Sequence, residues 1–532
     1  MNTRVSKILI FLILVFSFAS CAKRGRPTGG KKDSIPPILV SADPNHKSTH
    51  FKAKKIKISF DEYIKLKNVN KQLVVSPPLK NAPEITPVGT ASKFISIKLL
   101  DTLKENTTYT FNFGNSVVDN NEENKLERFK YVFSTGSYID SLEISGTIHD
   151  GFNQKSDDNI SVMLYEINEQ FSDSTIYKQK PMYVTSTLDS TNFELTNLKA
   201  GNYLLVAIKQ PVNSYIYKPK QDKIGFVNTV ITLPTDSVFS FPIFNEIPPF
   251  NLFRPVETSK GHILFGFEGN ADSLNVKLLD EKTPDFNEQL VFEKGKDTLN
   301  YWFQGIEKDS LIFEVSNKDF LEQVSVKLRS PNQDSLKINN NISSILEYRD
   351  TFSISSTNPI TKIDTSKIAL IHNDSIKTKF SAEIDSYKKR LFINFEKNYK
   401  TKYNIQFLPE ALFDVFGNTN DTLNYKFLTK ALENYGIINL TVSNVNSPII
   451  IQLITDKNEV ISSTIINESQ TLKFKNLPPK KYIVRAIFDT NYNGFWDTGS
   501  YLQKIQPEKV QYYSTPLELR ANWELNETFI LN

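Results

Sequence analysis

The stretch "LKAGNYLLVAIKQPVNSYIY", residues 198–217, aligns without a gap with "LPPKKYIVRAIFDTNYNGFW", residues 477–496. Each has a turn followed by a run of apolar and β-branched residues, which is typical of a buried strand. A repeated strand-and-turn unit indicates a chain built from copies of one module. The aligned pairs are Leu198 with Leu477, Tyr203 with Tyr482, Ala207 with Ala486, and Ile208 with Ile487.

A second repeat lies upstream of each copy. "LKENTTYTFNF" (103–113) resembles "YKTKYNIQF" (399–407), and both precede a loop with an aspartate, Asp119 or Asp414. Aromatic residues alternate with polar ones in these stretches, and a period of two predicts strands with one buried face. We call the module with 103–113 or 399–407 the A type, and the module with 198–217 or 477–496 the B type. The order of modules is therefore A, B, a middle piece, A and B.

The composition agrees with a string of β modules. At 532 residues the chain is too long for one core, and about 100 to 150 residues per domain predicts four or five domains. The 38 Phe and 22 Tyr favour strands, and no stretch sustains a long amphipathic helical pattern. We predict an all-β protein of tandem β-sandwich domains, with turn signals every 8 to 12 residues or so.

Two known families resemble parts of the chain. "IPPILVSADPN" and "ISFDEYI" resemble an SbsA-type bacterial Ig-like domain, and the turn of Leu198, Gly201 and Tyr203 resembles a carboxypeptidase regulatory-like module of transthyretin type. In the last copy Lys480 replaces that glycine. The whole layout resembles Ig-like lipoproteins of unassigned function from Gram-negative bacteria. These resemblances imply a structural framework and name no substrate.

The expected organisation follows from these motifs. It comprises a signal peptide at 1–20, a lipidated tether at 21–35, an Ig-like domain at 36–138, a regulatory-like β-sandwich at 139–246, a β-sandwich of unassigned type at 247–348, a second Ig-like domain at 349–431 and a second regulatory-like β-sandwich at 432–532.

The N-terminus predicts export and a lipid anchor. Eleven mostly apolar residues from Ile8 to Phe18 follow basic residues, and this run is too short to span a bilayer but fits a secretory signal. "FASC" then ends at Cys21, the only cysteine, and resembles the lipobox of bacterial lipoproteins, although Phe18 departs from the usual leucine. We expect Cys21 to carry fatty acyl chains such as palmitate. Ordinary cleavage that leaves a free thiol is the alternative.

The residues after Cys21 bear on location and partners. Ala22 is not the aspartate that commonly retains lipoproteins at the inner membrane, so the resemblance implies the outer membrane. Without an acidic run in the tether, we expect a periplasm-facing position, with surface exposure left open. The 63 basic and 59 acidic residues are interspersed, which disfavours nucleic acid as a partner.

The loop "DTNYNGFWD" has the spacing of a calcium loop. Oxygen ligands at alternate positions with glycine sixth are expected of such a loop, and Gly494 takes that place. The position of the usual final glutamate is Ser500, so any affinity should be weak. A plain turn explains the same residues, because Asn and Asp bond their own backbone. The candidate ligands are Asp489, Asn491, Asn493, the carbonyl of Phe495, and Asp497.

No motif of a known catalytic centre stands out in the sequence. A nucleophile elbow, a phosphate-binding loop and a zinc-binding His-Glu-x-x-His helix are all missing. We therefore expect a non-enzymatic envelope protein that scaffolds or binds other proteins. The alternatives are a surface adhesin or glycan-binding lipoprotein and an accessory subunit of an envelope hydrolase. Five aromatic residues are expected to pack in cores or on sheet faces, and a binding platform is the alternative; they are Trp302, Trp496, Trp523, Tyr512 and Tyr513.

Overall fold

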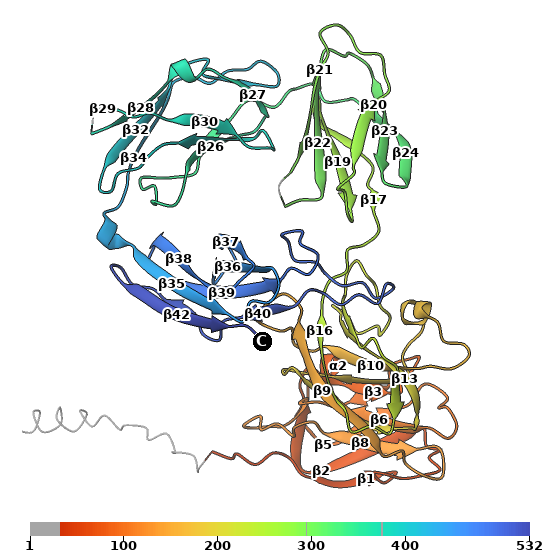
Figure 1. Ribbon diagram of the computed structural model, residues 1–532. Helices are drawn as coiled ribbons and strands as arrows, with labels where there is room; N and C mark the ends of the chain where they lie inside the picture. The colour runs from red at the N-terminus through yellow and green to blue at the C-terminus, as the bar shows by residue number, and fades with distance from the viewer. Residues whose placement is uncertain (1–31, 294, 374–375) are drawn as a thin grey trace, which may run out of the picture. The chain divides into compact units, whose positions relative to one another are not determined.

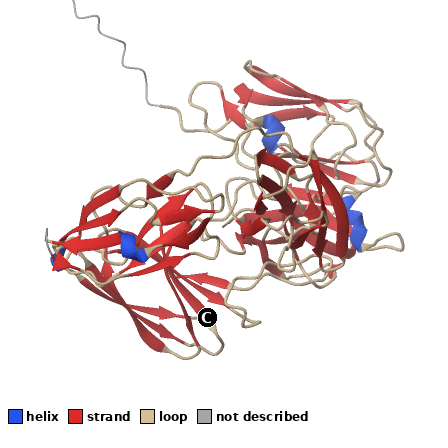
Figure 2. Ribbon diagram, turned by 90° about the horizontal axis from the view of Figure 1, so that it is seen from above, coloured by secondary structure: helices blue, strands red, loops and turns tan. Residues whose placement is uncertain are grey.

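The computed structural model describes residues 32–532 except 294, 374 and 375. Strands account for 48% of the structure and helices for 3%, so the all-β prediction is confirmed (Figure 2, strands in red). In the described ranges no helix has both the length and the apolar character needed to cross a membrane. The leader and Cys21 lie outside the described residues. The helical segments are α2 (Val69–Gln72), η1 (Asp173–Tyr177), η2 (Thr365–Lys367) and η3 (Leu432–Asn434).

The chain divides into two compact units. The first runs to Leu142 and includes Tyr183–Thr185 and Thr196–Lys199, and the second contains the remaining residues to Asn532.

Residues 39–134 form a sandwich of two antiparallel sheets. One has the order β1-β2-β5-β4, with β7 beside β2, and the other has the order β3-β6-β8. Figure 1 labels β1, β2 and β5 of the first sheet and all three strands of the second. Alternation in β2 buries Ile56, Ile58 and Phe60 and exposes the lysines between them. The strands are β1 (Leu39–Asp43), β2 (Lys55–Leu66), β3 (Val74–Ser76), β4 (Glu84–Thr86), β5 (Ser92–Lys98), β6 (Thr108–Asn112), β7 (Val117–Asp119) and β8 (Lys130–Ser134).

Residues 338–428 repeat this arrangement. The sheets have the orders β25-β26-β31-β30, β27-β33 and β29-β28-β32-β34, so β26 and β27 together take the place of β2. The first strand, β25, precedes residue 349, where we expected this domain to start. The strands are β25 (Ile338–Asn340), β26 (Phe352–Ser356), β27 (Ile360–Ile363), β28 (Ile368–His372), β29 (Ile376–Lys377), β30 (Ser381–Ile384), β31 (Arg390–Asn394), β32 (Lys402–Phe407), β33 (Leu412–Asp414) and β34 (Leu423–Leu428).

A buried tyrosine makes the same contact in both of these sandwiches. The Tyr109 hydroxyl accepts a hydrogen bond from the Lys104 backbone N–H at 2.9 Å, and the Tyr403 hydroxyl accepts one from Asn398 N–H at 2.8 Å. Each tyrosine is therefore bonded to the chain five residues upstream. The shared contact supports a common origin for the two sandwiches, since strand order alone can arise from packing rules.

The second B-type copy, residues 436–530, has the same strand order as residues 142–243. The first copy has sheets β11-β10-β13-β14 and β12-β9-β16, and the second has β37-β36-β39-β40 and β38-β35-β42. In both, the last strand pairs in parallel with the first, β16 with β9 and β42 with β35. The extra strands β15 and β41 pair with β13 and β39.

The strands of the first copy are β9 (Leu142–Asp150), β10 (Ser161–Glu166), β11 (Tyr183–Ser186), β12 (Asn192–Leu198), β13 (Gly201–Lys209), β14 (Lys223–Phe226), β15 (Ile231–Leu233) and β16 (Val238–Ile243). Those of the second are β35 (Gly436–Ser443), β36 (Ile449–Thr455), β37 (Val460–Ile466), β38 (Gln470–Leu477), β39 (Lys481–Phe488), β40 (Val510–Tyr512), β41 (Leu517–Glu518) and β42 (Glu524–Ile530).

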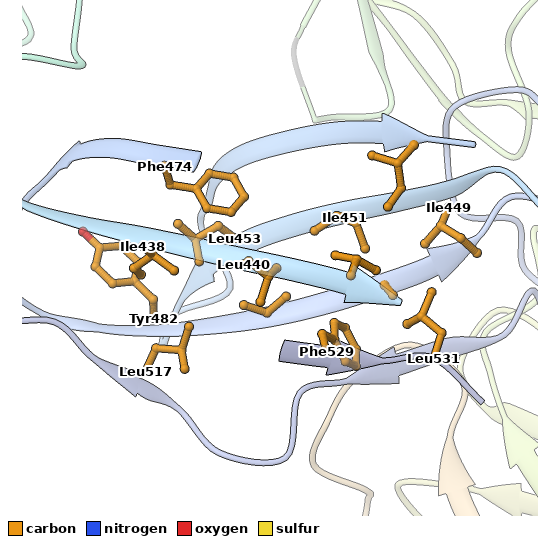
Figure 3. Packing of buried hydrophobic residues seen from close by; sticks show 14 of the residues in the cluster. Ile438, Leu440, Ile449, Ile451, Leu453, Phe474, Tyr482, Leu517, Phe529 and Leu531 are labelled. Carbon is orange, nitrogen blue, oxygen red and sulfur yellow. The ribbon is translucent and has the colours of Figure 1, made fainter. Parts of the chain in front are cut away.

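The core of residues 436–531 lies between its two sheets (Figure 3). Ile438 and Leu440 point inward from β35, and Ile451 and Leu453 meet them from β36. Tyr482 is fully buried, and its hydroxyl donates to the Pro478 carbonyl at 2.8 Å. The conserved tyrosine of the repeat therefore fills the core and also holds the preceding turn.

Residues 251–327 form another two-sheet sandwich. One sheet has the order β17-β19-β22-β21, with β18 beside β19, and the other has the order β20-β23-β24. Phe265, Tyr301 and Phe313 pack edge to face in its core. The strands are β17 (Asn251–Leu252), β18 (Val256–Ser259), β19 (His262–Glu268), β20 (Asn275–Leu278), β21 (Asn287–Phe292), β22 (Thr298–Gln304), β23 (Ser310–Asn317) and β24 (Phe320–Lys327).

Candidate functional site

The proposed calcium loop follows β39 and starts with a buried aspartate. Asp489 is 1% exposed, its Oδ1 accepts the Asn493 backbone N–H at 3.1 Å, and its Oδ2 accepts the Gly494 N–H at 2.9 Å. Gly494 has φ of 81°, in the left-handed region that glycine tolerates best. The first six residues of the loop, 489–494, therefore form a tight turn around the Asp489 carboxylate.

The second carboxylate of the loop is held by the two asparagines. Asn491 and Asn493 each donate a side-chain amide hydrogen to Asp497 Oδ2 at 2.7 Å. Glu508 closes the loop from its far end, since it accepts the Thr490 backbone N–H at 2.7 Å and the Asp497 N–H at 3.1 Å. The structure therefore brings all five predicted ligand residues into one hydrogen-bonded turn.

These contacts are those of a plain turn. Calcium takes six to eight oxygen ligands, whereas the amide nitrogens of Asn491 and Asn493 face Asp497 here. Within the described ranges, no group of three or more His, Cys, Asp or Glu side chains is placed to hold a metal ion. The Phe495 side chain is 74% exposed, and its N–H donates to Asn493 Oδ1 at 2.8 Å. We propose that the loop keeps its shape without a cation.

The melting temperature should be the same in millimolar calcium and in a chelator. The loop carboxylates already accept hydrogen bonds from the chain, so a cation would have to displace existing partners. Differential scanning calorimetry of the full protein measures this, with magnesium at equal ionic strength as the control. A rise in melting temperature specific to calcium, and lost in an Asp489→Asn variant, would restore the metal hypothesis.

A buried aspartate also organises a turn in each A-type sandwich, at the end of β7 in the first and of β33 in the second. Asp119 is 1% exposed and accepts backbone N–H groups from four consecutive residues, 121–124, at 2.7 to 3.1 Å. Burial raises the pKa of Asp119, but these donors outweigh burial and hold the pKa below its ordinary value. Asp414 is 2% exposed and accepts the Phe416 and Asn418 N–H groups.

Replacing Asp119 with asparagine should destabilise its sandwich by about 1.5–3 kcal/mol at neutral pH, the usual contribution of hydrogen bonds to a charged group. Because the folded pKa lies below the unfolded value, the stabilisation is present above pH ~4 and is lost as the pH falls through the folded pKa. Urea unfolding at several pH values measures both effects. The exposed Glu105→Gln change is the matched control, and an equal loss in both variants would contradict the role of Asp119.

The same long loop after β39 packs on the sandwich of residues 142–243, within the second unit. The Trp496 and Phe152 rings lie 4.7 Å apart, and the Arg485 guanidinium lies 4.3 Å from the Phe152 ring centroid. The Tyr512 hydroxyl donates to the Phe152 carbonyl at 2.8 Å. Phe152 is therefore enclosed by three side chains that follow it by more than 300 residues in the sequence.

Tyr501 is the best-buried side chain of this contact, at 0% exposure. Its backbone N–H donates to Glu246 Oε1 at 2.6 Å, its ring meets Phe226 edge to face at 5.3 Å, and its hydroxyl donates to Asp173 at 3.3 Å. Lys504 also pairs with Asp173 at 2.6 Å. Burial and the neighbouring Asp173 raise the pKa of Tyr501, so it stays neutral throughout the physiological range. Sequence motifs did not reveal this contact.

A hollow of about 1040 Å³ lies beside the loop and is rich in carboxylates. Several of these have partners: Glu268 pairs with Lys220, and Glu246 accepts the hydroxyl of Tyr217. The hydrogen bond from Lys296 holds the pKa of Glu293 below its ordinary value. The acidic lining consists of Glu246, Glu268, Asp272, Glu293, Asp297 and Asp497.

Trp302 packs in a core, as expected, and is not part of an aromatic platform. This side chain is 1% exposed and stacks on His262 at 3.5 Å, while the His262 ring nitrogens bond Thr258 and Asn300. Burial lowers the pKa of His262. Among the other candidates, Trp523 is half exposed, with Arg520 above its ring. The five aromatic side chains therefore do not share one surface.

Residues 33–135 match the bacterial Ig-like domain family. This confirms the Ig-like resemblance of the first domain and covers about a fifth of the 532 residues. A comparison with curated proteins found no match.

Solved structures similar to the chain include several bacterial surface proteins. The S-layer protein SbsC is 12% identical, with 91% of this chain and 68% of that chain covered and a TM-score of 0.14. The Bacillus anthracis TIE protein is 12% identical, with 100% and 79% covered and a TM-score of 0.15. The Bacillus cereus pilin BcpA is 11% identical, with 74% and 99% covered and a TM-score of 0.14. These low scores carry no argument about function.

Proposed function

We propose that the protein, whose residues 33–135 match the bacterial Ig-like domain family, is a lipid-anchored scaffold of the cell envelope that binds other proteins without catalysing a reaction. The lone Cys21 after an apolar leader supports the anchor. Tandem sandwiches support the scaffold, because each can bury its own core and present a separate surface.

The polar side chains of the loop after β39 support the non-catalytic role, because they bond the loop itself. Asp489, Asp497 and Glu508 all accept hydrogen bonds within the loop. Tyr501 and Lys504 contact the sandwich of residues 142–243. The longest polar loop of the B-type copies is therefore built to hold two sandwiches together, which is a structural task.

Crosslinking in intact cells tests the scaffold. The full chain with a C-terminal affinity tag should recover a defined set of envelope proteins that an unrelated lipoprotein with the same leader and tag does not recover. Recovery of the same proteins by both would overturn the scaffold. For the adhesin alternative, a glycan array and binding to intact cells provide the test, and a signal there would replace our proposal.

The hydrolase-accessory alternative has one supporting feature, the carboxylate-lined hollow beside Asp497. Two of its carboxylates, Glu246 and Glu268, are bonded to Tyr217 and Lys220. Substitution of Asp272 and Asp297 by asparagine in one chain should leave the activity of any co-purifying hydrolase unchanged. A loss of that activity would favour the alternative.

A further inference from the structure

The free edge of β37 is the one long sheet edge of the described residues without a protecting residue. β37 reads Val-Ile-Ser-Ser-Thr-Ile-Ile and pairs with β36 along one side. Ten edge strands in the described ranges have five or more residues, and nine of them carry a charge or a proline. These residues are Asp43 in β1, Lys130 in β8, Glu194 in β12, Pro242 in β16, Glu288 in β21, Glu322 in β24, Lys426 in β34, Lys473 in β38 and Glu524 in β42.

Such residues matter because an edge strand presents unpaired backbone N–H and C=O groups to any extended chain. Natural proteins block that pairing with charges, proline, short strands or covering segments. β37 has no charge and no proline, and at seven residues it is not short. Its β-branched residues favour an extended backbone. Val460 is 48% exposed and Ile465 is 53% exposed, so the strand is open to solvent at both ends.

The equivalent edge in the first B-type copy is covered. β11 has the same place in its sheet, but it is four residues long, and Tyr183, Val184 and Thr185 are between 2% and 5% exposed. The Val184 N–H also donates to Ser76 Oγ at 3.1 Å. The two copies share a strand order, so the open edge of β37 is a property of this copy and not of the fold.

The turn that contacts the Ile465 side chain carries two exposed aromatic residues. A side-chain atom added at Gly494 would lie 3.7 Å from Ile465, so the turn of residues 489–497 adjoins the end of β37. Tyr492 and Phe495, on either side of that glycine, are each 74% exposed. A strand added to β37 would therefore find aromatic surface beside the backbone edge, which is how strand addition combines affinity with side-chain selection.

The charges around β37 indicate what kind of strand fits. The strand itself is neutral, and the exposed residues before it, Asp456, Lys457 and Glu459, sum to −1. Glu468 adds another negative charge after it. Two copies of β37 aligned antiparallel would bring these negative ends together, which disfavours self-pairing. A strand with an uncharged centre and basic ends complements both.

We propose that β37 binds an extended segment of a partner protein that has an uncharged, β-branched centre and lysine or arginine at both ends. The segment extends the sheet beyond β37 by backbone hydrogen bonds and packs against Tyr492 and Phe495. This inference rests on the proposed protein-binding role and gives that role a site. It does not depend on the lipid anchor.

Peptide titration of the full purified chain in detergent tests the site. One fluorescent peptide has a Thr-Val-Thr-Ile-Thr-Val centre with lysines at both ends, and a second has the same centre with glutamates. The lysine peptide should bind about tenfold more tightly at low salt, a difference of about 1.4 kcal/mol, and salt should reduce the difference. Equal binding of the two peptides, or no binding, would overturn the proposal.

A variant with a charge on β37 tests whether the peptide binds at this strand. Ile465→Lys adds to β37 the kind of residue that the other edges carry and should weaken the lysine peptide about tenfold or more. Ile312→Lys is the matched control, because Ile312 is 45% exposed on β23, which is paired on both sides. Circular dichroism and melting should show that both variants fold. Equal weakening in both variants would refute the β37 site.

Two further measurements separate strand addition from other modes of binding. Hydrogen exchange of the β37 amides should slow on adding the lysine peptide, and unchanged exchange would refute backbone pairing. Sedimentation of the chain alone should give a monomer. A dimer that Ile465→Lys dissociates would show that the edge binds a second copy, which would overturn the partner that we propose. Crosslinking in cells tests the scaffold role and not the β37 site, so failure of one proposal can be told from failure of the other.

Discussion

A Tyr501→Ala variant should separate the loop after β39 from the sandwich of residues 142–243. Tyr501 is fully buried between Phe226 and Tyr177, with ring centroids at 5.3 and 6.2 Å. Loss of a buried aromatic side chain costs about 3–5 kcal/mol. Because the contact joins two sandwiches that each keep their own core, the loss should appear as detachment of the loop and not as global unfolding.

Hydrogen exchange and limited proteolysis measure this detachment. Residues 489–509 and the backbone around Phe226 should lose protection in Tyr501→Ala, while the core strands β35 and β36 keep theirs. Tyr501→Phe is the conservative control, since it keeps the ring and loses only the hydroxyl bond to Asp173, a cost of about 0.5–1.5 kcal/mol. Tyr492→Ala, at an exposed site of the same loop, should have no effect.

If residues 489–509 were equally protected from hydrogen exchange in Tyr501→Ala and Tyr492→Ala, the Tyr501 contact would not hold the loop in place. If β35 and β36 also lost protection, Tyr501 would belong to the core of its own sandwich. The neighbouring Gly499 gives a second measurement of the same contact. A side chain there would lie 2.5 Å from the Phe244 ring and 2.6 Å from the Ile505 carbonyl, so Gly499→Val should expose the loop in the same way as Tyr501→Ala.

The all-β class was predictable because sheets leave a local signal in the sequence. In β35 every second residue is buried, and the central strands β10 and β13 are apolar along most of their length. Each strand can be recognised from a few neighbouring residues. The repeat was predictable for the same reason, since Tyr203 and Tyr482 mark equivalent strands.

The contacts of the loop were not predictable, because they depend on which surfaces meet. The sequence around Trp496 and Tyr512 is as consistent with a binding platform as with a buried contact. Trp302 illustrates the same limit, since its place against His262 depends on the register between β19 and β22. The boundary before β25 was also missed, because three residues, Ile-Asn-Asn, are too few to show alternation.

The candidate calcium loop shows where a motif stops being informative. The spacing of Asp489, Asn491 and Asn493 satisfies both a metal loop and a chain of Asx turns, since both need short polar side chains at alternate positions. The amide hydrogens of Asn491 and Asn493 bond Asp497 here, and calcium binding would require both amides to turn their oxygens toward the ion. Side-chain direction is set by packing, which a spacing rule does not contain.

A Cys21→Ala variant should move from the membrane fraction to the soluble fraction. We propose that Cys21 carries the lipid, and two or three acyl chains bind a bilayer far more strongly than one, at about 0.8 kcal/mol for each buried CH₂ group. The mature chain would otherwise depend on weak attraction between its basic tether and anionic lipid. Fractionation of cells at moderate salt, followed by immunoblotting, measures the change.

Two controls make that result specific to the lipid. Ser20→Ala keeps a small residue before the cysteine and should remain in the membrane, and metabolic labelling with an alkyne fatty acid should mark the original chain but not Cys21→Ala. Full retention of Cys21→Ala, or equal labelling of both, would refute anchoring at this residue. If Cys21→Ala left the membrane only at high salt, the charges of the tether would be the anchor. The scaffold would then be a peripheral protein whose attachment is set by ionic strength and not by acylation.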